Sequence, residues 1–147
     1  MAKDLNSPGI MKQGNFSSLS PAWSKVATVG FADLSAAALT NDIELYELQA
    51  KEFIHSVLIV PSVAFSGGAV ASFTLSVGIV GNLTKYHTAQ DAFTGFVVTA
   101  QENSNFLESL TTTTSIRIAA IATGANLDAL TAGSVDVYVQ KSILPIA

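Results

Sequence analysis

Three stretches of the chain alternate apolar and polar side chains with a period of two. Residues 73–80 read FTLSVGIV, residues 116–121 read IRIAAI and residues 135–140 read VDVYVQ. This period puts the apolar side chains on one face of an extended strand, whereas a helix needs a period near 3.6. Residues 43–48 and 53–60 also predict strands, and the second is almost continuously apolar, as expected of a central strand. The pattern therefore predicts an all-β fold.

The segments between these strands are rich in residues typical of turns. They include SGG at 66–68, GNLT at 81–84, QENSN at 101–105 and GANLDALTAG at 124–133. Residues 34–40 are ambiguous between a turn of helix and a bend, and no stretch is long enough for the helical crossovers of a parallel sheet. We predict an antiparallel β-sandwich or jelly roll.

The first part of the chain differs in composition from the rest. Residues 1–22 are rich in Asn, Ser, Gly, Gln and Pro and show little periodicity, which predicts an N-terminal arm followed by a β-sandwich domain at residues 23–147. Phe16 and Trp23 are the large apolar side chains of this region, and both are candidates to anchor the arm. A Trp beside the first strand is also often part of the core, so both interpretations of Trp23 stay open.

The composition predicts contact with other protein subunits. Charged residues make up 12% of the chain, against about 25% in ordinary soluble domains, while hydrophobic residues reach 49% and the mean hydropathy is +0.44. No run of about 18 apolar residues could span a membrane, and the polar start of the chain lacks the apolar core of an export signal. We therefore expect no membrane partner, synthesis in a cytoplasm, and burial of apolar surface between subunits.

Several classes of function lack the residues that they need. The chain has no cysteine, a net charge of −4 and seven scattered basic residues, so we expect no disulfide, no thiol nucleophile and no nucleic-acid partner. His55 is predicted to be a structural residue of a strand, and His87 a solvated loop residue. Because no metal-binding or catalytic spacing surrounds them, we predict no catalytic residue, no metal and no cofactor, and hence no enzyme.

The glycines near residue 80 do not indicate a phosphate-binding loop. Gly78 lies inside an alternating strand, and Gly81-Asn82 fits the positive φ of a tight turn. The sequence Asn82-Leu83-Thr84 has the spacing of a glycan acceptor, but without an export signal we interpret it as a turn. Glu44 and Glu47 are predicted to protect an edge strand from unwanted pairing.

The aromatic residues supply the remaining interface candidates. Tyr138 shares the outward side of its strand with Asp136 and Gln140, and Tyr86 is the second tyrosine that we consider. The predicted interface residues are thus Phe16, Trp23, Tyr86 and Tyr138. A glycan is an alternative partner, served by these tyrosines or by the threonines at 111–114, although the threonine run is better explained as a polar strand entry.

Three segments resemble a known class of proteins. VGIVGNLTKY at 77–86, SIRIAAIATGANLDALTAGSVDVYV at 115–139 and the terminal KSIL look like small β-sandwich virion proteins of tailed bacteriophages, particularly the capsid decoration (cement or auxiliary) type, over residues 42–144. The resemblance implies a homotrimer on the outside of an icosahedral head, at junctions of the major capsid protein, with an arm reaching across neighbours. It also implies assembly into the virion from the host cytoplasm. The alternative is a carbohydrate-binding, neck, tail or fibre-base module of the particle.

Overall fold

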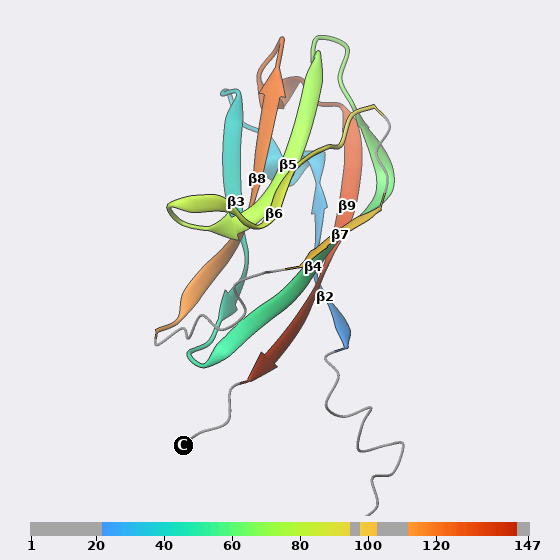
Figure 1. The fold of residues 1–147 in the computed structure, drawn as a ribbon. Coiled ribbons are helices and arrows are strands. Elements are labelled where there is room, and N and C mark those ends of the chain that lie inside the picture. The colour runs from blue at the N-terminus through green and yellow to red at the C-terminus, as the bar shows by residue number, and fades with distance from the viewer. Residues whose placement is uncertain (1–21, 95–97, 103–111, 144–147) are drawn as a thin grey trace, which may run out of the picture.

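The computed structural model describes residues 22–94, 98–102 and 112–143. Within these ranges two four-stranded antiparallel sheets pack face to face (Figure 1), which confirms the predicted all-β sandwich. The strands are β2 (Trp23–Gly30), β3 (Thr40–Leu48), β4 (Glu52–Ser66), β5 (Ser72–Ile79), β6 (Asn82–Asp91), β7 (Thr99–Glu102), β8 (Thr114–Thr123) and β9 (Ala132–Ile143). A short helix α2 (Phe31–Leu34) and a 3₁₀ turn η1 (Leu127–Ala129) lie in the connections.

The first strand pairs with the last, the second with the next to last, and so on inward along the chain. One sheet has the order β2-β9-β4-β7 and the other the order β3-β8-β5-β6. The pairs β5–β6, β4–β7, β3–β8 and β2–β9 are therefore nested. In sequence, β5–β6 is the innermost pair and β2–β9 the outermost. This nested antiparallel pairing of eight strands over two sheets is that of a jelly roll.

The core lies between the two sheets and is filled by alternate residues of each strand. Val135, Val137 and Val139 of β9 are fully buried, as are Ile116 and Ile118 of β8. Each such side chain stabilises the fold by about 1.5–3 kcal/mol relative to an exposed one. The period of two in the sequence thus identified the inward faces of these strands.

Strand β4 is longer than the predicted 53–60 and continues through Pro61. β7 pairs with β4 only between Ser56 and Ile59, so one side of β4 is open at Pro61. The register with β9 also shifts just after Pro61. An open side and a bulge are the places where a strand tolerates a residue without an N–H.

The described part of the chain begins and ends at one end of the sandwich. Trp23 pairs with Gln140, and Ile143 pairs with Glu52. Here Lys141 Nζ lies 2.8 Å from Glu52 Oε1 and 5.4 Å from the ring centre of Tyr46. No helix among the described residues is both long enough and apolar enough to cross a membrane.

Candidate interaction surfaces

Two of the predicted interface residues lie on the same outer face, that of the sheet β2-β9-β4-β7. Trp23 in β2 pairs with Gln140 in β9, and Lys25 pairs with Tyr138. Directly paired residues share a face, so Trp23 and Tyr138 are diagonal neighbours across the two strands. Trp23 is 40% exposed, and the alternative that placed it in the core is wrong.

Apolar side chains extend this face into β4. Tyr138 pairs with Leu58 and Asp136 pairs with Val60, and all four side chains are half-buried. We call the surface formed by Trp23, Tyr138, Leu58 and Val60 the β2–β9–β4 face. It combines aromatic and aliphatic groups, as the buried centre of an interface does.

The charges on the β2–β9–β4 face neutralise one another. Lys25 Nζ lies 2.8 Å from Asp136 Oδ1, and Thr28 Oγ1 donates a hydrogen bond of 2.7 Å to the same oxygen. The hydrogen bond from Lys25, then that from Thr28, lowers the pKa of Asp136, and the same contact with Asp136 raises the pKa of Lys25. The face therefore presents a closed ion pair beside its apolar groups.

The other two predicted interface residues do not join this surface. Phe16 lies outside the described residues. Tyr86 is only 4% exposed and belongs to the core, so its ring offers little surface to a partner or to a stacked sugar.

The expectation that His87 is a solvated loop residue is wrong. β6 begins directly after the turn at Gly81, which has φ +88° as predicted, so His87 lies inside a strand and is fully buried. Its Nδ1 is 2.8 Å from the carbonyl oxygen of Thr88. His55 lies within β4 as predicted, and its Nε2 is 2.7 Å from Ser142 Oγ. Across residues 22–94, 98–102 and 112–143, no cluster of three metal-ligating side chains occurs.

The β5–β6 hairpin folds over the outer face of the second sheet. Val77 pairs with His87 and Ile79 pairs with Asn82, so three residues of β5 stand opposite six of β6. The surplus residues of β6 bulge out of the sheet, and the hairpin projects sideways past β3 and β8 (Figure 1). A Cβ at Gly78 would lie 2.1 Å from Asn82 O, so only glycine allows this close approach.

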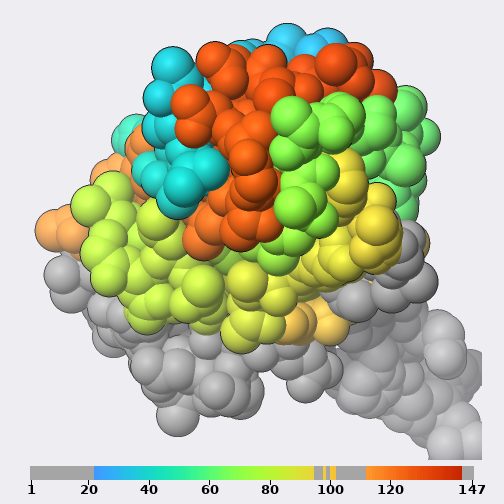
Figure 2. Space-filling model, turned by 90° about the horizontal axis from the view of Figure 1, so that it is seen from above, coloured from blue at the N-terminus to red at the C-terminus, as the bar shows by residue number. Residues whose placement is uncertain are grey.

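A groove of about 340 Å³ lies between this hairpin and the start of β3. Seen from above, the cyan start of β3 and the yellow-green hairpin lie beside each other (Figure 2). We call this the hairpin groove, and its lining comprises Thr40, Asn41, Asp42, Ser76, Leu83, Thr84, Ala119, Ala120 and Ile121. Ser76 and Ala119 are paired residues of β5 and β8 and are almost fully buried beneath the hairpin.

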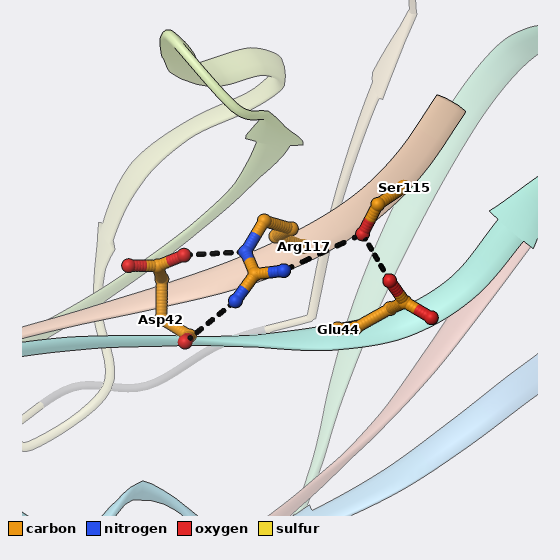
Figure 3. A network of polar contacts seen from close by, with 4 residues as sticks. All are labelled: Asp42, Glu44, Ser115 and Arg117. Carbon is orange, nitrogen blue, oxygen red and sulfur yellow. Dashed lines mark hydrogen bonds and ion pairs between the residues drawn. The ribbon is translucent and has the colours of Figure 1, made fainter. Parts of the chain in front are cut away.

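A network of polar contacts borders the groove (Figure 3). Arg117 Nε lies 2.5 Å from Asp42 Oδ2, and Arg117 Nη2 donates a 3.1 Å hydrogen bond to the Asp42 carbonyl oxygen. Ser115 Oγ donates a hydrogen bond of 2.5 Å to Glu44 Oε2 and accepts one of 3.5 Å from Arg117 Nη1. The network holds the Asp42 carboxylate at the groove with its charge compensated.

The comparisons with known proteins concern the fold. No protein-family model and no curated protein matches the sequence. The structure is similar to a chain of the cyanophage Pam1 capsid asymmetric unit, with a TM-score of 0.60 and 22% sequence identity. The likeness covers 86% of this chain and 87% of that chain, so it extends over nearly the whole of both. At this identity, what the two chains share is the fold.

Proposed function

We propose that this chain is a structural protein of a tailed-phage particle, of the capsid decoration (cement) type. It acts without catalysis, as a homotrimer on the outside of the head, and stabilises the head through contacts with the major capsid protein. The observation that carries the proposal is the likeness to a chain of a phage capsid over nearly the full length of both chains. The charge-poor composition supports the same proposal, because the centres of interfaces between subunits are depleted of charged residues.

The β2–β9–β4 face is the proposed contact surface. A stable interface buries about 800 Å² on each partner, about a tenth of the 7930 Å² accessible here. Trp and Tyr are the side chains that most often dominate binding energy, and truncating such an anchor typically costs 2 kcal/mol or more. Trp23 and Tyr138 are therefore the proposed anchors of this face, and residues 1–22 add further contacts, including that of Phe16.

Co-sedimentation with heads of the phage that carries the gene tests the proposal. We expect Trp23→Ser and Tyr138→Ser each to weaken binding to the heads about 30-fold, the equivalent of about 2 kcal/mol. Val80→Ser is the matched control, because Val80 is 73% exposed at the tip of the β5–β6 hairpin and lies outside the proposed surface.

The control decides how the result is interpreted. Wild-type binding by Val80→Ser, together with loss in the other two variants, supports the β2–β9–β4 face as the contact surface. Equal binding by all three variants would contradict that assignment. A wild-type chain that does not sediment with the heads would contradict the decoration role itself.

A further inference from the structure

The hairpin groove joins an apolar floor to a ring of hydroxyl groups. Ala119 and Ile121 line it with aliphatic groups, whereas the hydroxyls of Thr40, Ser76 and Thr84 supply groups that both donate and accept hydrogen bonds. A mostly apolar hollow with a few placed polar groups is the usual form of a small-ligand site.

The hydroxyl of Ser76 makes no hydrogen bond to another group within the described ranges, and the residue lines the groove. Ser72, on the same face of the same strand, differs in this respect because its Oγ lies 2.6 Å from Thr123 Oγ1. The Ser76 hydroxyl is therefore open to a hydrogen-bonding ligand that enters the groove.

The polar groups around the groove favour an uncharged partner. Arg117 occupies Asp42 Oδ2 and compensates its charge, which leaves Oδ1 free to accept a hydrogen bond from a ligand. Thr40 lies on the same outer face of β3 as Asp42, and its hydroxyl can also accept a hydrogen bond. Hydroxyl groups suit such a mixture, since each can donate to these acceptors and accept from Ser76.

The volume sets the size of the ligand. The groove holds about 340 Å³, which corresponds to about eleven water molecules at about 30 Å³ each. A hexose ring with its hydroxyls has about a dozen non-hydrogen atoms, each comparable in size to a water molecule. We propose that the hairpin groove binds a neutral sugar unit, with its C–H face on Ala119 and its hydroxyls at Ser76, Thr40 and Asp42.

An aliphatic side chain of a partner protein is the competing occupant. It would fit the floor formed by Ala119 and Ile121, but it would bury the Ser76 hydroxyl without a partner, which is unfavourable. The two occupants therefore respond in opposite directions to removal of that hydroxyl. Ser76→Ala weakens binding of a sugar and leaves binding of an aliphatic group unchanged or stronger.

Amide chemical shifts measured during titration of the full chain test the site. The probes are glucose, galactose, mannose, N-acetylglucosamine and rhamnose, with N-acetyl-leucinamide as the aliphatic probe, each added well above a millimolar concentration. A ligand of about a dozen atoms at ordinary ligand efficiency has a dissociation constant in the millimolar range. We expect at least one sugar to shift the amides of residues 40–42, 76 and 84, and Ser76→Ala to weaken that sugar about tenfold.

Two further variants serve as a control outside the groove and as a test of its floor. Ser72→Ala makes the same substitution on the same face outside the groove and is expected to bind the sugar as the wild type does. Ala119→Val narrows the floor and is expected to abolish binding, and the spectra of all variants report whether they are folded.

The outcomes separate this site from the proposed role in the particle. Failure of every sugar to shift these amides, or sugar binding that Ser76→Ala leaves unchanged, would overturn the proposal. Shifts caused by N-acetyl-leucinamide alone would assign the groove to a protein side chain instead. Because Ser76 lies on the sheet opposite the β2–β9–β4 face, Ser76→Ala is expected to bind phage heads as the wild type does, whatever the sugars show.

Discussion

A side chain at position 78 would collide with the β5–β6 hairpin. An ideal Cβ there would lie 2.1 Å from Asn82 O and 2.5 Å from the carbonyl carbon of Leu83. These are backbone atoms, which cannot move aside as a flexible side chain can. We therefore expect Gly78→Ala to displace the hairpin and to lower the free energy of unfolding by about 1–3 kcal/mol, the usual range for overpacking. Urea denaturation measures the change.

Gly68 provides the control for this substitution. A Cβ at Gly68 would meet no atom within 4 Å, and its backbone does not adopt a positive φ. Gly68→Ala is therefore expected to change the free energy of unfolding by less than about 0.5 kcal/mol. Equal effects of the two substitutions would mean that the hairpin does not lie over β5 as described.

Asp91 and Asp136 make the stability of the protein depend on pH. The backbone amides of Phe93 and Thr94 donate hydrogen bonds to Asp91 and lower its pKa, and contact with Lys25 lowers that of Asp136. A carboxyl whose pKa is lowered by folding stabilises the native state above its ordinary pKa of 3.8, and this contribution is lost as the pH falls through the lowered value.

The corresponding measurement is urea denaturation at pH 7 and at pH 3. We expect a lower free energy of unfolding at pH 3, and a smaller difference between the two pH values in Asp91→Asn, whose side chain cannot titrate. Identical free energies at both pH values in the wild type would contradict these pKa shifts.

At the scale of elements, the free edges of the described sheets carry features that oppose strand addition. β3, at one edge, bears Asp42, Glu44 and Glu47 and has a bulge after Glu44, which confirms the predicted edge position of the two glutamates. β2 is bulged near Lys25, and β7 has only four residues. Charges, bulges and short strands all discourage pairing between edges. The faces of the sheets are therefore the surfaces suited to assembly.

Removing the charge from β3 is expected to cause aggregation. The double substitution Glu44→Val and Glu47→Val leaves an apolar edge strand that can pair with other chains, and its light scattering should rise with time and concentration. Glu44→Gln with Glu47→Gln is the control for loss of charge without added β-branched apolar side chains. If the valine variant stayed as soluble as the wild type, the bulge after Glu44 would be sufficient protection.

The elements that could be predicted from the sequence are those with an undisturbed period of two. β5, β8 and β9 have this pattern and are confirmed, whereas the sequence predicts a loop after residue 81, where the structure has β6. Its bulge shifts residues between the two faces, so Tyr86 and His87 are both buried in succession and no period is visible. The true length of β4 was hidden by Pro61, which is acceptable only because β7 ends before it.

Local sequence pattern also limits how much of the interaction surfaces can be predicted. Tyr138 was recognised as outward-facing because its strand alternates regularly, but its position beside Trp23 depends on a pairing between segments more than 100 residues apart. The hairpin groove was missed for the same reason. It brings Thr40 of β3 next to Leu83 of the hairpin, and local pattern contains no information about that approach. The sequence does place Ser76 on the outer face of β5, because it alternates with the core residues of that strand.

At the scale of the whole molecule, the described core contains no residue of the proposed arm. All buried core residues of the described chain lie between Val29 and Val139, so deletion of residues 1–22 removes none of them. We expect the truncated chain to keep the melting temperature of the wild type and to bind phage heads more weakly, because the proposed contacts of the arm with the head are lost. Calorimetry and co-sedimentation measure the two effects. Equal head binding by the truncated chain would contradict a role of the arm in attachment.

The mass of the purified protein in solution shows whether it forms the proposed homotrimer. Light scattering at several concentrations distinguishes a single chain of 15.3 kDa from a stable assembly. We predict a mass three times that of one chain, which stays the same over the range of concentrations. A wild-type mass of 15.3 kDa at every concentration would contradict the proposed homotrimer.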